Sequence, residues 1–437
     1  MSEMQPAAAL PDASSADDRP PLSRQEWALL CSAYLSQFVA SGFFFMAMTA
    51  ILRERGANLE QIGWVYLLGI VPGLKFVWAP LMDRYGFGPR GHYSAWLALM
   101  QALLMATLLW LATLPMTADQ PLPLAALLAG CTLVSLLTAC QDIAADGLSC
   151  RLLGPAQRGL GNAMQLACGM LGWAVGGGGV LIMYGQWGWQ PAILSLTALN
   201  AITLALALLY REPPYARPVA PAGGHASLVA YARRLWGFWQ QPGTGWRWFV
   251  LIATVNCGMC MAYSLMTPML VDAGWSMEKI GLMTNVYGVA LGTTAMLALG
   301  LAIKRWSAAR ALPWVMAAQA LAVVALMGLL LAWSDGWALF FLAAFMMLCA
   351  PLEVLLSTLM MARASAGTPA TDFSMQHGIY TVAGMVVGSA LSLQLAGWLG
   401  YGPTLALALA ASLIVCVTVP RLWHAADQRA RQAGVQY

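Results

Sequence analysis

A series of apolar runs, each long enough to cross a lipid bilayer, constrains this chain more than any other feature. Crossing a hydrocarbon core of about 30 Å takes about 20 helical residues. The chain is 60% hydrophobic and only 9% charged, whereas soluble domains carry about 25% charged residues. We therefore predict an all-α polytopic membrane protein with twelve transmembrane helices. The runs cover approximately residues 26–52, 60–82, 93–115, 121–148, 158–184, 189–210, 246–271, 279–303, 310–333, 337–361, 373–398 and 401–420.

The order of polar and apolar stretches divides the chain into two six-helix halves. The first 24 residues are polar and acidic, unlike a cleavable signal peptide, which starts with a basic segment before an apolar one. A polar interruption after the sixth run includes Leu228–Trp239, which could form an amphipathic helix on the membrane surface. The predicted divisions are a disordered cytoplasmic tail (1–24), an N-terminal half (25–210), a cytoplasmic linker (211–245), a C-terminal half (246–420) and a cytoplasmic tail (421–437).

The two halves share sequence matches in chain order. Gly56–Gly63 (GANLEQIG) matches Gly274–Gly281 (GWSMEKIG). Further along the chain, a slightly smaller shift in residue number aligns Asp142 of the first half with Glu353 of the second. Internal repeats of this kind are typical of transporters, whose site lies at the interface between the repeats. We therefore predict two pseudo-symmetric halves that face each other across a central cavity.

The distribution of positive charge predicts the orientation. Of the 22 lysines and arginines, only Arg53, Arg55 and Lys279 would lie opposite the side that holds both termini, and Lys75 would lie within the membrane. Cytoplasmic loops carry the excess of positive charge in membrane proteins. Both termini are therefore predicted to be cytoplasmic.

Lys75 lies inside the second apolar run and requires a partner, because a charge at the centre of a membrane helix costs about 2.5–3.5 kcal/mol on insertion scales. Asp142, in the fourth run, lies at a similar depth, and Asp146 follows one turn later on the same face. We predict a Lys75–Asp142 ion pair. It could be a static bridge or a proton-sensitive pair, since a carboxylate removed from water binds a proton more readily unless a cation is close.

Glu353 follows Pro351 in the tenth run and has no obvious cation in its own span. A carboxylate inside the membrane is a functional candidate by default, so Glu353 could bind substrate or a proton; a hydrogen-bonded packing position is the alternative. His377, near the inner end of the eleventh run, is a further candidate because histidine titrates near physiological pH. A lone histidine near a helix end is more often structural.

Other polar side chains form two groups of candidates. Those inside apolar runs could line the cavity, although each could equally make an interhelical hydrogen bond; they are Gln37, Gln141, Asn162, Gln165, Asn256, Tyr263 and Asn285. Charged residues at span ends could form a cytoplasmic gate; they are Asp83, Arg84, Arg90, Arg151 and Arg158. The run Gly176–Gly179 is expected at a close helix contact or a point of flexing.

Several function classes find no support in the sequence. GxxxxGK[ST], HExxH and GxSxG contexts are absent, so we expect no enzyme and no cofactor. The nine cysteines lie in or beside apolar runs; Cys257 and Cys260 form a CxxC there, which favours packing over metal or redox chemistry. The basic residues are dispersed rather than clustered, which argues against nucleic acid as a partner.

Twelve spans with a basic DRYG loop between the second and third resemble the major facilitator superfamily, and the resemblance covers the whole chain. The stretches LKFVWAPLMDRYG, QDIAADGL and RGLGNAMQ are similar to the branch that contains AmpG muropeptide permeases, acetyl-CoA transporters and RhtX/FptX siderophore permeases. The loop departs from the superfamily's usual pattern by beginning with Ala79 instead of glycine. The residues on branch motifs are Lys75, Asp83, Arg84, Gln141, Asp142, Arg158, Gly161, Asn162 and Gln165.

Chain length guides the choice within that branch. AmpG-type permeases commonly carry two further spans, so the resemblance implies an RhtX/FptX-like protein. The implied function is a proton-coupled importer of a small siderophore or iron chelate, pyochelin-like, across the bacterial inner membrane by alternating access. The alternatives are a muropeptide permease and, less favoured, a membrane enzyme or sensor. The expected partners are the small-molecule substrate, protons and the lipid bilayer, with no metal bound as a cofactor.

Overall fold

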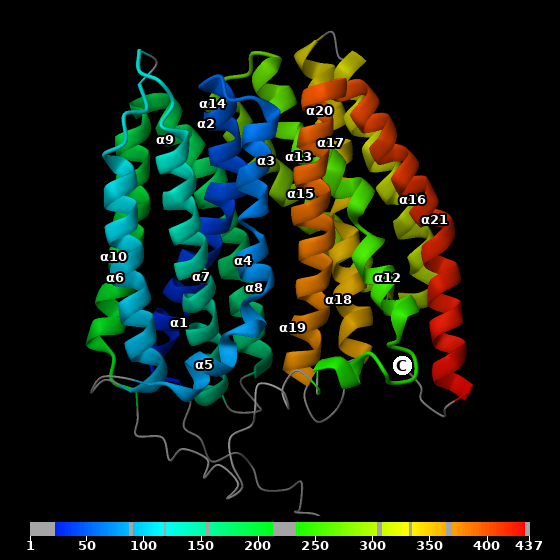
Figure 1. Cartoon of the computed structure of the whole chain (residues 1–437), viewed down its shortest axis with the longest axis horizontal. Helices are drawn as coiled ribbons and strands as arrows, with labels where there is room; N and C mark the ends of the chain where they lie inside the picture. The colour runs from blue at the N-terminus through cyan, green and yellow to red at the C-terminus, as the bar shows by residue number, and fades with distance from the viewer. Residues whose placement is uncertain are drawn as a thin grey trace, which may run out of the picture.

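The computed structural model describes residues 22–86, 91–117, 119–153, 158–212, 233, 235–303, 308–331, 334–363 and 369–432. All regular structure in these residues is helical, and the helices run side by side along the height of one bundle (Figure 1). The all-α prediction is therefore confirmed. We call the end of the bundle that holds α5 and α19 the lower end and the opposite end the upper end, as drawn in Figure 1.

The N-terminal half begins at a capped helix. The Ser23 side chain accepts a hydrogen bond from the backbone N–H of Glu26, and the Glu26 carboxylate accepts one from the backbone N–H of Ser23 at 2.8 Å, so two orphan donors at the helix start are satisfied. The elements of this half are α1 (Arg24–Gly42), η1 (Phe43–Met48), α2 (Thr49–Glu54), α3 (Leu59–Leu67), α4 (Ile70–Gly73), η2 (Lys75–Val77), α5 (Ala79–Arg84), α6 (His92–Ala112), α7 (Leu124–Leu152), α8 (Arg158–Ala174), η3 (Val175–Gly179), α9 (Val180–Trp187) and α10 (Trp189–Leu209).

The C-terminal half follows the same order of spans. Its elements are α12 (Trp246–Thr254), α13 (Cys257–Asp272), α14 (Met277–Ile280), η4 (Gly281–Tyr287), α15 (Gly288–Ile303), α16 (Ala308–Met327), η5 (Gly328–Leu331), α17 (Asp335–Cys349), α18 (Pro351–Arg363), α19 (Pro369–Tyr380), η6 (Thr381–Gly388), α20 (Ser389–Leu399) and α21 (Tyr401–Gln432). The last helix continues past residue 420, where the C-terminal half was predicted to end. It continues through Pro420, because the segment that follows is rich in alanine, arginine and glutamine, which favour helix.

Eleven helical segments of the described residues are long and apolar enough to cross a membrane; the predicted second span is divided into shorter pieces. In Figure 1, α3, α4 and α5 follow one another from the upper to the lower end. Proline interrupts the hydrogen-bond ladder of a helix, and Pro72 lies in α4 and Pro80 in the first turn of α5. The second span still crosses the bundle, but it does so in short pieces. Lys75 lies in the 3-10 turn between α4 and α5.

The two halves share one core towards the upper end and have separate cores towards the lower end. The largest cluster of buried apolar residues joins the halves and includes Phe43, Met46 and Ile280. A second cluster contains only N-terminal-half residues such as Leu29 and a third only C-terminal-half residues such as Trp248. Helix pairs that touch across the halves at the upper end are α2 with α13, α3 with α20 and α9 with α14 (Figure 1). The halves therefore share one core above and pack mainly within themselves below, where α19 still touches α4 and η2.

The four-glycine run lies where three helical segments cross. A Cβ added at Gly176 would lie 1.9 Å from the carbonyl oxygen of Val39, and one at Gly177 would lie 2.4 Å from Asn285 Oδ1. η3 also touches η4 of the other half. Glycine is required here because the neighbouring segments approach closer than any side chain allows. This agrees with the close helix contact that was one of the two expectations for this run.

Some predicted features fall outside the described residues. They are most of the N-terminal tail, most of the linker with its surface helix, and Arg90 of the gate. Residues 235–238 of the linker are helical.

Candidate functional site

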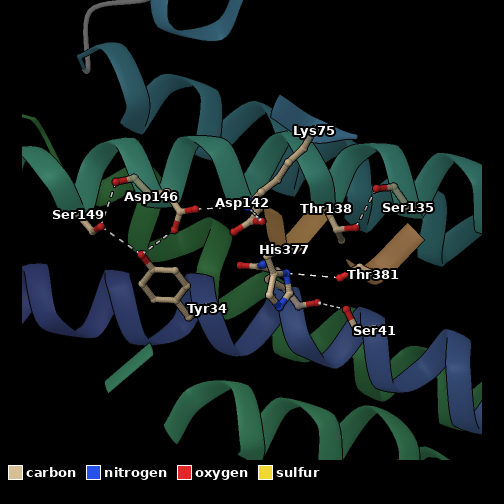
Figure 2. Close-up of polar contacts among 11 residues, drawn as sticks. Tyr34, Ser41, Lys75, Ser135, Thr138, Asp142, Asp146, Ser149, His377 and Thr381 are labelled. Atoms are coloured by element: carbon tan, nitrogen blue, oxygen red, sulfur yellow. Dashed lines mark hydrogen bonds and ion pairs between the residues drawn. The ribbon is translucent and has the colours of Figure 1, made fainter. Parts of the chain in front are cut away.

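A row of polar side chains follows one face of α7. Ser135, Thr138, Asp142, Asp146 and Ser149 are three or four residues apart, which places them above one another on a helix. Figure 2 shows this row on the side of α7 that faces α1. The row is the centre of the site in the N-terminal half.

Lys75 reaches this row from the interrupted second span. Its Nζ donates a hydrogen bond to Asp142 Oδ2 and lies 3.4 Å from Asp146 Oδ2 (Figure 2). Tyr34 donates to Asp146 Oδ1 at 3.1 Å and to Ser149 Oγ at 3.2 Å. One ammonium group therefore serves two carboxylates, so the cluster carries a net negative charge when both are ionised.

A second cluster lies in the C-terminal half around Glu353. Tyr380 donates to Glu353 Oε2 at 3.0 Å, and His377 Nε2 lies 3.3 Å from Glu353 Oε1. Asn256 donates to the Tyr380 hydroxyl at 2.7 Å, and Thr381 Oγ1 lies 3.4 Å from His377 Nδ1. Glu353, which has no cation in its own span, therefore has a histidine and a tyrosine of the next helix as partners. α18 and α19 pack against each other and bring the two side chains together.

Solvent reaches most of these charged side chains. Lys75 is 26% exposed, Asp146 42%, Glu353 43% and His377 42%, whereas Asp142 is only 9% exposed. Charged groups at this depth require water or a partner, since lipid solvates them poorly. η2, which carries Lys75, touches α19, which carries His377. The two clusters therefore lie on neighbouring elements of the two halves, in the lower part where the cores are separate.

A small cavity within the N-terminal half borders Asp142. Its volume is about 30 Å³, and it is lined by Gln37, Ser41, Phe44, Phe45, Val65, Leu68, Gly69, Pro72, Ser135, Thr138, Ala139 and Asp142. Gln37 Oε1 is buried and has no hydrogen-bond partner among the described residues. We call this cavity the N-half niche.

The predicted cavity-lining residues have different environments. Gln37 lines the niche and Asn256 belongs to the Glu353 cluster. Gln141 is fully buried and donates to the carbonyl of Ala33 at 2.9 Å, so it packs α7 against α1.

Three further candidates lie away from the niche. Asn285 lies at the glycine crossing, and the hydroxyl of Tyr263 lies 3.9 Å from Met46 Sδ across the halves. Gln165 is partly buried in α8, while the Asn162 side chain lies outside the description.

Of the predicted gate, the structure describes the side chain of Arg151. It pairs with Glu212 at 2.6 Å and lies 4.2 Å above the ring of Tyr93. These contacts join the end of α7 to the start of α6 and to the first residues of the linker, and the gate stays a prediction. The side chains of Asp83, Arg84 and Arg158 are outside the described set.

Polar contacts between the halves occur instead at the upper end. Arg53 of α2 forms two hydrogen bonds with Asp272 of α13, at 2.7 and 2.6 Å, and Tyr401 donates to Asp272 at 2.6 Å. On the other side of the bundle, Trp398 donates to the Glu60 carboxylate at 2.5 Å. We call these contacts the upper latch. The sequence placed Arg53 on this side of the membrane but offered no signal for its partner.

Sequence reasoning also missed site residues on already recognised helices. Ser135, Thr138 and Ser149 share the helical spacing of Asp142 and Asp146, and this spacing could have identified them. Tyr380 lies one turn after His377 and could have been found in the same way. No local signal identifies Tyr34, which reaches Asp146 from another helix.

Comparison with known proteins decides the family. Residues 30–392 match the sequence profile described as Major Facilitator Superfamily. The chain belongs to the major facilitator superfamily. It is therefore a multi-pass membrane transporter by family, and its two six-helix halves are those of the superfamily fold.

Individual proteins that resemble this chain share fewer than a third of the aligned residues with it. The chain is 28% identical over 267 residues to the anhydromuropeptide permease of Escherichia coli K12, which covers 61% of this chain and 52% of the permease. It is 27% identical over 270 residues to an uncharacterized protein of Haemophilus influenzae, covering 58% of this chain and 61% of that protein. The chain thus spans about half to three fifths of the length of these relatives.

Solved structures show the same fold. A mutant of the nucleoside transporter NupG superposes with a TM-score of 0.69 at 13% identity, covering 92% of this chain and all of that one. A bacterial homologue of the human lysosomal transporter Spinster, in an inward-facing and occupied conformation, has a TM-score of 0.68 at 14% identity, covering 93% of this chain and 97% of that one.

Proposed function

We propose that this protein imports an anhydromuropeptide-like solute by proton-coupled alternating access. The observation that carries the proposal is that two charged clusters meet at the boundary between the halves, Lys75 with two aspartates on the N-terminal side and Glu353 with His377 on the C-terminal side. In the proposal these clusters are the two walls of the solute cleft. The 28% identical permease supports this solute class, which was the alternative at the level of sequence. The siderophore interpretation gains no support from these comparisons.

The charges in the cleft favour coupling to protons. Three carboxylates share one lysine and one histidine there, so the cleft is negatively charged when all carboxylates are ionised. Two carboxylates close together disfavour each other's ionised form, and Lys75 contacts Asp142 more closely than Asp146. Asp146, the aspartate farther from Lys75, and Glu353, the carboxylate of the opposite wall, are the proton-binding groups of the proposal.

The same proposal assigns the two ends of the bundle. The lower end is cytoplasmic and faces the interior of a bacterial cell across its inner membrane, and the upper latch closes the other side. Opening the upper end requires the Arg53–Asp272 and Glu60–Trp398 contacts to break. Solute and proton would bind while the upper end is open, and their release into the cytoplasm would follow when the upper latch forms again.

Uptake into proteoliposomes tests the function directly. We expect radiolabelled anhydromuropeptide to accumulate when the outside is acidic, and an uncoupler to abolish the accumulation. Glu353→Gln and Asp146→Asn should lose accumulation driven by the gradient while retaining exchange of solute across the membrane, because exchange needs no net proton movement. Asp335→Asn, an exposed aspartate at the upper end, is the matched control and should transport like the wild type.

Two outcomes would overturn this assignment. Accumulation of a pyochelin-like chelate without accumulation of muropeptide would restore the siderophore interpretation. Uncoupler-insensitive uptake that is unchanged in both variants would remove the proton role of Asp146 and Glu353.

A further inference from the structure

We propose that the N-half niche is a subsite for a hydroxyl-bearing arm of the solute's sugar. The inference rests on the proposed function and names the part of the solute that this wall of the cleft recognises. Asp142 lies at its border with the cleft, and Gln37, Ser135 and Thr138 contribute its other polar groups.

The polar atoms of the niche are prepared to accept hydrogen bonds. Ser135 donates its proton to the carbonyl of Leu68 at 2.9 Å, and Thr138 donates to the carbonyl of Val134 at 2.8 Å. Their oxygen lone pairs remain available as acceptors. Gln37 adds an amide, whose oxygen is buried without a partner among the described residues and whose NH2 group can donate. The niche therefore favours a hydroxyl group, which both donates and accepts hydrogen bonds.

Apolar surface completes the niche. Phe44 and Phe45 line it together with aliphatic residues of the second span, and Phe45 stacks on Trp173 with ring centroids 6.1 Å apart and an interplanar angle of 17°. A sugar presents hydroxyl donors beside C–H surface, which matches acceptors beside aromatic rings. A metal chelate commits its oxygen atoms to the metal and offers fewer donors, so the niche fits it less well.

Size and position specify how much of the sugar can enter. A volume of about 30 Å³ holds about two water molecules by this measure, so a hydroxyl or hydroxymethyl arm fits whereas a ring does not. Close to Gly69, the C-terminal half covers the niche: a Cβ there would lie 2.8 Å from Val386 Cγ2. The arm would therefore enter from the side of Asp142, and the ring would remain in the cleft.

Binding of a peptide-free disaccharide tests the subsite. The probe is N-acetylglucosaminyl-1,6-anhydro-N-acetylmuramic acid, titrated by calorimetry into the full chain in nanodiscs. Thr138→Val and Gln37→Leu each remove one acceptor with little change of volume, and we expect each to weaken binding about tenfold to a hundredfold. Thr132→Val is the matched control, because Thr132 lies on the same helix, is exposed and donates only to Leu128; it should change the dissociation constant less than twofold.

Mono-deoxy analogues of the disaccharide separate recognition from folding. One analogue should bind the wild type about tenfold more weakly than the parent sugar yet bind Thr138→Val or Gln37→Leu as well as the parent does, since the missing hydroxyl no longer has an acceptor to lose. This coupling between ligand and side chain does not arise from a general loss of structure.

The outcomes distinguish the two levels of the proposal. If the wild type binds the disaccharide but Thr138→Val and Gln37→Leu behave like Thr132→Val, the subsite is wrong and the function stands. If no deoxy analogue shows coupling, the subsite is again wrong. If the wild type binds neither the disaccharide nor anhydromuropeptide, the proposed function fails and the subsite fails with it.

Discussion

The two walls of the proposed cleft come from repeated halves but hold their carboxylates differently. On the N-terminal wall, Asp142 shares Lys75 with Asp146. On the opposite wall, Glu353 bonds to a histidine and a tyrosine on the following helix. The repeat conserves the position of a carboxylate, whereas the partners come from helices that are not equivalent in the two halves. A symmetric scaffold can therefore carry an asymmetric charge arrangement.

Removing the lysine should have the largest effect on this asymmetry. Lys75→Met leaves two carboxylates without their cation, and breaking a buried pair costs about 3 kcal/mol. We expect uptake to fall more than a hundredfold and thermal unfolding in detergent to occur at a clearly lower temperature. Lys279→Met is the control, because its partner Asp335 is 71% exposed; exposed pairs contribute less than about 1 kcal/mol. Equal effects of the two changes would contradict a special role for Lys75.

The glycine crossing, where the two walls are held together, should be nearly as sensitive. Gly176→Ala places a methyl group 1.9 Å from a backbone oxygen, and overpacking of this kind costs about 1–3 kcal/mol. Gly179→Ala meets nothing closer than 3.9 Å and serves as the control. We expect lower thermal stability and lower uptake for Gly176→Ala only; a normal Gly176→Ala protein would show that the halves can separate at this point without penalty.

Breaking the upper latch should change the balance between states more than it changes stability. Arg53→Ala removes a partly exposed pair worth about 1 kcal/mol, which shifts a conformational equilibrium about fivefold. Spin labels at Trp64→Cys and Leu399→Cys, on α3 and α20, should report a larger population of long distances. The charge swap Arg53→Asp with Asp272→Arg should restore the original distance distribution. If it does not, the Arg53–Asp272 ion pair does not control the equilibrium between the states.

The smallest effects on uptake are expected from removing the hydroxyl groups of Tyr34 and Tyr380, one on each wall. Tyr380→Phe removes a donor to Glu353 and also leaves Asn256 without its partner. Tyr34→Phe leaves Asp146 with Lys75. A neutral hydrogen bond contributes about 0.5–1.5 kcal/mol, so we expect a loss of uptake of about fivefold to tenfold for Tyr380→Phe and about twofold for Tyr34→Phe. The reverse order would show that the N-terminal wall depends more on its hydroxyl group than its contacts suggest.

Much of the fold could be predicted because its causes are local. Apolar runs of about 20 residues indicate spans wherever they occur, and a lysine such as Lys75 signals a partner because lipid does not solvate its charge. Depth alone was enough to propose Asp142 as that partner. The break in the second span was partly visible in Pro72 and Pro80, whose effect on a helix does not depend on the rest of the molecule.

Only the tertiary structure decided which faces meet. The Glu353–His377 contact depends on the rotation of α19 against α18, the Arg53–Asp272 contact on the docking of the two halves, and the niche on three helices leaving a space together. None of these follows from periodicity or composition, because each requires a distance between residues far apart in the chain. The sequence by itself determined the spans, their order and the residues too polar for lipid, while packing between helices determined which of those residues form a site.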